Sequence, residues 1–109
     1  MADLLGTFEQ SVLLAILRLG AEAYGRGVLN QVQVLAQRDV SAGAVYATLD
    51  RLEARGLVSS SIEEGTPVRG GRARRYYTVS AEGQRALGET RRALNAMWKD
   101  VRLPAEATR

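Results

Sequence analysis

Residues 41–58 read SAGAVYATLDRLEARGLV, and this segment sets the plan of the whole domain. Ser41 is a good N-cap for a helix. The apolar residues of one helix face then recur every three or four positions: Val45, Leu49 and Leu52. Gly56 is placed to end this helix in the left-handed conformation. A helix that opens with small residues is typical of the second helix of a helix-turn-helix motif.

Two amphipathic helices are predicted before this segment. The first begins with a capping box of Thr7 and Gln10 and stops at Gly20. Its wide apolar stripe can face both the chain's own core and another subunit, and contains Val12, Leu13, Ile16, Leu17 and Leu19. The second helix opens at Tyr24 and Gly25 and carries a further apolar face of Val28, Leu29, Val32, Leu35 and Ala36.

A β-hairpin is predicted directly after the helix-turn-helix. Residues 57–63 and 74–79 have the β-branched and aromatic content of strands, and residues 64–73 form a glycine-rich turn between them. Two strands around an arginine-bearing loop at this place in the chain make a wing. The sequence therefore predicts a mostly α fold with a small two-stranded β-wing, a winged helix-turn-helix.

A long last helix is predicted from Ala81 to Arg102, with Ser80 as its N-cap and Pro104 as its stop. So small a body cannot cover a helix of this length. We therefore expect three parts: a DNA-binding winged helix-turn-helix at 1–80, a C-terminal dimerisation helix at 81–103 and a flexible tail at 104–109.

Composition excludes several classes of function. The 109 residues suit one domain, and the chain has neither Cys nor His. It therefore lacks thiol nucleophiles, zinc–thiolate ligands and the usual general base, so we expect no enzyme, metal or cofactor. Neither a signal peptide nor a bilayer-spanning segment is recognisable, and the expected location is the cytoplasm.

The third helix supplies the first candidate DNA contacts. Small residues at its start let the backbone approach the base edges of a major groove. The candidate residues are Ser41, Ala42, Gly43, Tyr46, Ala47, Asp50 and Arg51. Two alternatives stay open: Tyr46 either touches DNA or packs against the second helix, and Gly43 either permits close approach or is a tolerated glycine at a helix start.

The hairpin supplies the second set of candidate DNA contacts. The net charge is only +3, but residues 65–81 contain no acid and hold four arginines, Arg69, Arg72, Arg74 and Arg75. A basic loop at a wing is placed to meet phosphate or a narrow minor groove, although a charge run can also be a solvated face. Arg75 alternates with Arg74 along the strand, so it can pair with an acid instead. All positively charged side chains except Lys99 are arginines. This preference suits binding to phosphates and guanine edges, but the composition of the genome explains it equally well.

Apolar residues on the first and last helices indicate a subunit interface. The candidates are Leu13, Leu17, Leu87, Leu94, Met97, Trp98 and Val101, of which Leu87, Leu94 and Val101 lie seven residues apart. Trp98, with Met97 and Leu94, can also stack a small planar hydrophobic effector at a dimer axis. The alternative for Trp98 is a plain interface anchor with no ligand.

Two long segments resemble the PadR family of regulators. The run from Gly43 to Val58 resembles that family's recognition helix and first wing strand, and the run from Gly71 to Gly83 its second strand and entry to the last helix. The pair Tyr24-Gly25 also fits. With a single terminal helix, the chain is similar to the compact branch of the family.

The resemblance implies a homodimeric transcription factor, usually a repressor, on a partly palindromic operator in double-stranded DNA. Some compact members resemble drug sensors with paired tryptophans at the dimer interface, and Trp98 lies at a comparable place. Arg102 stands one turn later, where an acid would better suit cationic drugs. The alternative function is a winged-helix module for protein contacts without an operator.

Overall fold

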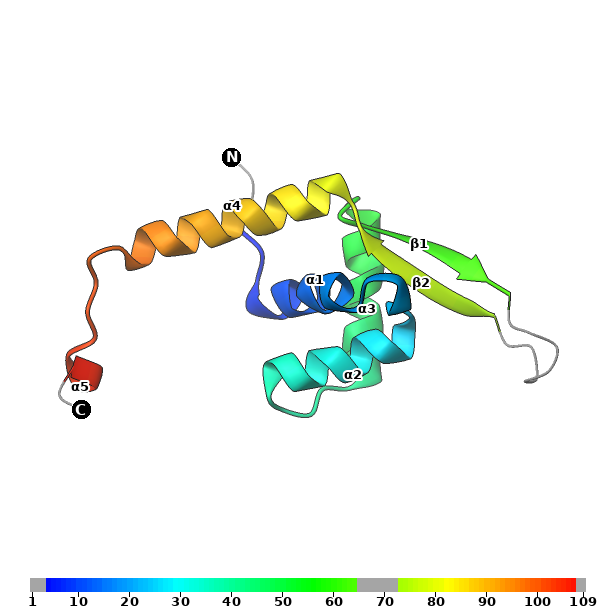
Figure 1. The fold of residues 1–109 in the computed structure, drawn as a ribbon, viewed down its shortest axis with the longest axis horizontal. Helices are drawn as coiled ribbons and strands as arrows, with labels where there is room; N and C mark the ends of the chain where they lie inside the picture. Colours follow the sequence, from blue (N-terminus) through cyan, green and yellow to red (C-terminus); the bar gives the residue numbers. More distant parts are fainter. Residues whose placement is uncertain (1–3, 65–72, 108–109) are drawn as a thin grey trace.

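Three packed helices, a β-hairpin and a projecting helix make up the fold (Figure 1). The computed structural model describes residues 4–64 and 73–107. In chain order its elements are α1 (Thr7–Leu19), the 3-10 turn η1 (Gly20–Glu22), α2 (Gly25–Ala36), α3 (Ala42–Ala54), β1 (Val58–Glu63), β2 (Arg74–Val79), α4 (Ala81–Trp98) and α5 (Pro104–Ala107). This architecture confirms the predicted fold class.

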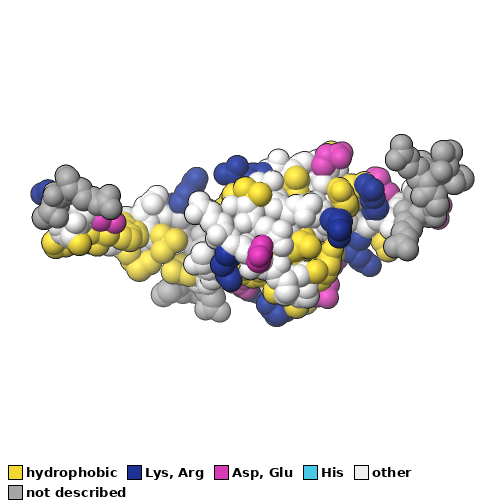
Figure 2. Space-filling model, turned by 90° about the horizontal axis from the view of Figure 1, so that it is seen from below, with side chains coloured by type: hydrophobic (Ala, Val, Ile, Leu, Met, Phe, Trp, Pro, Cys, Tyr) yellow, Lys and Arg dark blue, Asp and Glu magenta, His cyan; other side chains and the backbone are white. Residues whose placement is uncertain are grey.

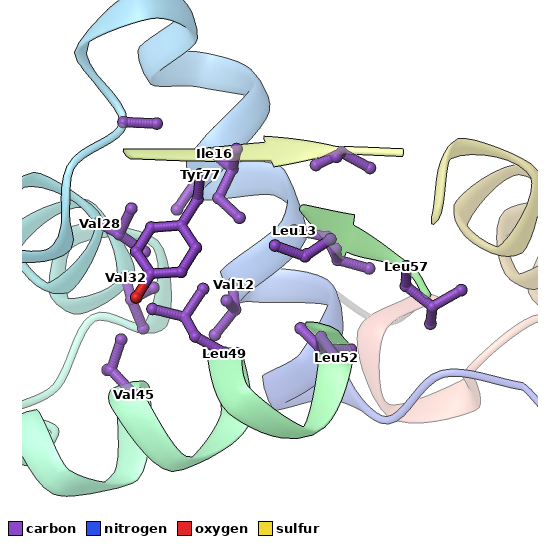
Figure 3. Packing of buried hydrophobic residues seen from close by; sticks show 14 of the residues in the cluster. Val12, Leu13, Ile16, Val28, Val32, Val45, Leu49, Leu52, Leu57 and Tyr77 are labelled. Carbon is purple, nitrogen blue, oxygen red and sulfur yellow. The ribbon is translucent and has the colours of Figure 1, made fainter. Parts of the chain in front are cut away.

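The core lies between the first three helices and one face of the hairpin (Figure 3). The ring of Tyr77 reaches from β2 toward Val28 and Val32 of α2. The buried residues of the predicted helix faces share this cluster, and they include Val12, Leu13, Ile16, Val28, Val32, Val45, Leu49 and Leu52. The apolar periodicity of each helix is thus explained by one common core.

The hairpin is antiparallel and its register pairs Val58 with Val79 at the base and Glu63 with Arg74 at the outer end. Directly opposite residues share a face of the sheet, so the buried pair at the base turns inward. On the other edge of β2, Tyr24 forms a single bridge with Tyr76, and the N–H of Tyr77 donates to the carbonyl oxygen of Ala23 at 2.8 Å. The segment before α2 is therefore fixed to the hairpin.

The two serine-capped helix starts agree with the sequence, and the start of α1 does not. The side chains of Ser41 and Ser80 accept hydrogen bonds from the N–H groups of the residues three positions later, as predicted for N-caps. The predicted capping box of Thr7 and Gln10 is wrong: the N-cap is Gly6, whose N–H donates to Oε1 of Glu9 at 2.9 Å. Glu9 also lies closer to the positive end of the helix dipole, which favours this arrangement.

The last helix is shorter than predicted. It ends at Trp98 rather than Arg102, because Lys99 is extended and Asp100 has a left-handed φ of 62°. Asp adopts this conformation more readily than most residues do. Pro104, expected as the stop, instead begins the short helix α5. Val101 consequently stands outside the seven-residue repeat that was expected to include it.

The start of α4 is bonded to the end of α3. The hydroxyl of Ser80 donates to the carbonyl oxygen of Gly56 at 2.7 Å, and its N–H donates to that of Leu57 at 3.0 Å. Further along, the buried Thr90 accepts a hydrogen bond from the N–H of Leu5 at 3.1 Å. These bonds fix the direction of α4, which then extends beyond the body (Figure 1).

Candidate nucleic-acid interface

The head of α3 is small and open to solvent. Ser41 accepts a hydrogen bond from the N–H of Ala44 at 3.0 Å, which fixes the first turn. Ala42, Gly43 and Ala44 are all exposed. A Cβ built on Gly43 meets nothing nearer than the Ser41 hydroxyl, at 4.0 Å. The glycine is therefore not required by packing within the chain.

The rest of the outer face of α3 is also exposed. Tyr46, Ala47, Asp50 and Arg51 are accessible, while the opposite face is buried in the core. The guanidinium of Arg51 donates to the hydroxyl of Thr48, on its own helix, at 3.0 Å. This face presents one aromatic ring, one methyl group, one carboxylate and one guanidinium.

Tyr46 packs against α2, the first helix of the motif, and stays partly exposed. A Cβ built on Gly25 would lie 3.0 Å from a ring carbon of Tyr46 and 3.3 Å from its hydroxyl. A side chain at position 25 would require the ring to shift by a few tenths of an ångström. The side chain is still 39% exposed. Packing on α2, one of the two alternatives from the sequence, is thus observed, and it leaves the ring accessible at the surface.

The two described arginines of the hairpin take different partners. Arg74 pairs in register with Glu63 and Arg75 with Ile62, so the two side chains start on opposite faces of the sheet, as the alternation predicted. Arg69 and Arg72, the other two predicted contacts, lie outside the described residues.

Arg74 stacks on an aromatic ring beside α2. Its guanidinium carbon lies 4.4 Å from the ring centroid of Tyr24, a cation–π distance. The rings of Tyr24 and Tyr76 are 6.0 Å apart and tilted by 53°. Tyr24 is the N-cap of α2, so this arginine is held at the first turn of that helix. The sequence analysis gave Tyr24 only as the start of the second helix and as part of a family resemblance, and no local pattern connects it to Arg74.

Arg75 is bonded toward the recognition helix. Its guanidinium donates to the hydroxyl of Ser60 at 2.9 Å, and that hydroxyl donates to Oε2 of Glu53 on α3 at 2.7 Å. Among the described residues Arg75 forms no direct ion pair with an acid, and it is connected to Glu53 only through this serine. Beside it, burial raises the pKa of Tyr77, an effect that Arg75 opposes and that Asp50 and Glu53 reinforce.

The residues predicted for a subunit interface divide into three groups. Leu13 was predicted wrongly: it is 0% exposed in the core and cannot reach another subunit. Leu17, Leu87 and Leu94 line a groove of about 390 Å³ between α1 and α4. Met97, Trp98 and Val101 are exposed beyond it, with Trp98 55% exposed.

The same groove contains a residue that the sequence analysis missed. Leu14 is 42% exposed and lines the groove beside Leu17. Both residues stand on the outer side of an otherwise buried helix stripe, one helical turn apart. Figure 2 shows hydrophobic side chains gathered along the part of the molecule that projects from the body, and Lys and Arg side chains where the hairpin leaves it.

Residues 4–64 and 73–107 contain neither a candidate metal site nor a helix that could span a membrane. No group of three or more His, Cys, Asp or Glu residues there could hold a metal ion. None of the helices in those segments is long and apolar enough to cross a bilayer.

The chain is similar to known regulators of transcription. Residues 13–89 match the model of the transcriptional regulator PadR-like family. The transcriptional regulator Rv3488 of Mycobacterium tuberculosis is 47% identical over 62 residues, which cover 57% of this chain and 54% of that protein. The match thus spans about half the length of this curated relative.

Solved structures of regulators share the fold. A PadR-like transcription factor from Bacteroides fragilis is 31% identical, with a TM-score of 0.63 over 87% of this chain and 82% of that one. A PadR family transcription regulator from Clostridium difficile R20291 is 23% identical, with a TM-score of 0.66 over 86% and 93% of the two chains. The second likeness concerns the fold alone.

Proposed function

The chain belongs to the PadR-like family of transcriptional regulators, and from this premise we propose that it is a sequence-specific DNA-binding repressor that acts as a homodimer. Its operator is double-stranded and partly palindromic. The recognition helix α3 enters a major groove, and the hairpin arginines contact the flanking backbone.

One observation carries this proposal: α3 and a hairpin arginine meet around the first turn of α2. Tyr46 of α3 covers Gly25, and Arg74 of β2 stacks on the adjacent Tyr24. The exposed face of α3 and the hairpin therefore belong to one continuous surface. A duplex that receives the helix in its groove presents its phosphates along such a surface.

The head of α3 fits base edges. Its exposed atoms at Ala42, Gly43 and Ala44 are backbone and methyl groups, which allow a close approach and can contact thymine methyls. Further along, Asp50 can accept a hydrogen bond from cytosine, and Arg51 can donate to guanine. Ser41, Tyr46 and Ala47 complete the proposed contact set, with the hydroxyls directed to phosphate oxygens.

The proposed dimer uses the groove between α1 and α4. Leu14, Leu17, Leu87 and Leu94 line it, and the exposed end of α4 offers Met97 and Trp98. In a two-fold dimer the same surface occurs on both subunits. Helix α4 can therefore form one wall of the groove in its own subunit and also supply side chains that fill the groove of the partner subunit. A second copy of this chain is therefore the occupant that we propose.

We further propose that a small planar hydrophobic molecule releases the repressor from DNA. The support is the 55% exposed ring of Trp98, which has Met97 and Leu94 on the same helix. Flat aromatic surfaces stack such molecules when a partner subunit closes the site from the other side.

Fluorescence anisotropy with labelled duplexes tests the function. The probes are fragments from upstream of the chain's own gene and a scrambled duplex of equal length. We expect tighter binding to one upstream fragment, and a steep loss of affinity as salt rises. Equal affinity for all duplexes would contradict an operator. No binding even at low salt would instead favour a protein-interaction module.

A further inference from the structure

We propose that Tyr24 is a positioning residue for DNA binding: its ring holds the guanidinium of Arg74 ready for a phosphate, whereas Arg75 secures the hairpin to α3. This inference rests on the proposed DNA-binding function. It gives two adjacent arginines different roles, and it adds to the interface a tyrosine that itself contacts no DNA.

The ring of Tyr24 lies between Tyr76 of the hairpin and the first turn of α2. Its backbone forms a bridge with Tyr76 in the hairpin, and the two rings are 6.0 Å apart. A Cβ built on Gly27 would lie 3.3 Å from a ring carbon of Tyr24, so the ring lies directly on the first turn of α2. A ring fixed in this way is a rigid platform for Arg74.

Stacking leaves the hydrogen-bonding edge of Arg74 available. A guanidinium that lies over a ring uses its π face, while its five N–H groups point outward in its own plane. Among the described residues, the side chain of Arg74 makes no hydrogen bond or ion pair, although Glu63 is directly across the sheet. Its guanidinium lies over Tyr24 instead.

Arg75 has the opposite character. One of its guanidinium nitrogens is bonded to Ser60, and Ser60 is bonded to Glu53 in the last part of α3. This chain of two hydrogen bonds links the hairpin to the recognition helix. We therefore assign Arg75 to the orientation of the hairpin and Arg74 to phosphate.

The experiment is a set of salt titrations of DNA binding, with a duplex probe and five proteins: wild type, Arg74→Ala, Tyr24→Leu, Tyr24→Phe and the double variant Tyr24→Leu/Arg74→Ala. Loss of one phosphate contact is expected to lower the slope of log K against log salt by about 0.9 and to weaken binding roughly eightfold at 0.1 M salt in Arg74→Ala. Tyr24→Leu keeps the charge but loses the platform, so we expect about two- to fivefold weaker binding at an unchanged slope.

The controls separate positioning from damage. Tyr24→Phe keeps the ring and is expected to bind like wild type, and the double variant is expected to match Arg74→Ala. If Tyr24→Leu binds like wild type while Arg74→Ala does not, the inference is overturned. It is also overturned if Tyr24→Leu weakens binding equally with and without Arg74, because the loss is then general. Absence of salt-dependent binding by wild type removes the proposed function itself, and the inference with it.

A measurement on the wild-type protein avoids dependence on variants that fail to fold. Side-chain NMR signals of the two arginines are followed while the duplex is added. We expect the Nε–H signal of Arg74 to shift and that of Arg75 to move little. A shift confined to Arg75 overturns the assignment.

Discussion

Gly83 in the first turn of α4 lies against the backbone of Leu57, which follows the end of α3. A Cβ built on Gly83 would overlap the carbonyl oxygen of Leu57 and would come within 2.7 Å of Cγ1 of Val79. Both neighbours are held in place, the first by its bond from Ser80 and the second by its pairing with Val58. The contact joins the proposed dimerisation helix to the turn between the recognition helix and β1.

Gly83→Ala is expected to destabilise the protein. Overpacking against backbone costs about 1–3 kcal/mol in the free energy of unfolding, which exceeds the gain of up to about 1 kcal/mol from alanine's helix propensity. Urea denaturation measures the difference. Gly88→Ala, in the same helix, is the matched control: there the nearest atom is the flexible end of Arg92 at 3.3 Å. Equal stability of the two variants would contradict the close approach.

Gly43→Ala is expected to separate stability from DNA binding. Among the described residues outside the helix backbone, the nearest atom to the added methyl group is the Ser41 hydroxyl oxygen at 4.0 Å, so the free energy of unfolding should stay the same or rise by up to about 1 kcal/mol. If the α3 backbone approaches bases here, binding to the operator should weaken by about 1–3 kcal/mol, the cost of one mismatched base pair. Unchanged affinity would mean that the glycine is a tolerated helix-start residue.

Tyr77 is expected to make stability fall at alkaline pH. Burial raises its pKa above the ordinary value of 10.0, with contributions from Asp50 and Glu53. The unfolded chain then loses the phenol proton at a lower pH than the folded protein does. The free energy of unfolding therefore decreases as pH rises past 10.0. Urea midpoints measured from pH 8 to pH 11 should fall less steeply for Tyr77→Phe than for wild type, and parallel profiles would refute this account.

Leu17→Glu is expected to disrupt the dimer without unfolding the chain. Leu17 is 47% exposed and lines the groove between α1 and α4, so a carboxylate there would be buried only in the assembled pair. Sedimentation velocity should show monomers. Val34→Glu is the control, because Val34 is 67% exposed on α2 and is not among the residues that line the groove. If Val34→Glu also dissociates the dimer, or Leu17→Glu leaves it intact, the groove is not the interface.

The local elements followed from the sequence because their causes are local. A serine cap, a 3.6-residue apolar period and a left-handed glycine each act within about one helical turn, so α3 begins after Ser41 and ends before Gly56 as predicted. The strand at Arg74–Val79 was predicted with its observed bounds. Errors occurred where two local signals compete, as at Gly6 against Thr7, or where Asp100 ended a helix that the apolar pattern continued.

Contacts between distant segments were decided only by the tertiary structure. The apolar periodicity placed Leu13 and Leu17 on the same face of the first helix. In the structure Leu13 is completely buried, whereas Leu17 is 47% exposed. The stack of Arg74 on Tyr24 joins residues 50 positions apart, because β2 lies alongside the segment before α2. Sequence patterns indicate which face of each helix or strand is buried. Which residues of other elements that face contacts depends on how all the elements pack around one core.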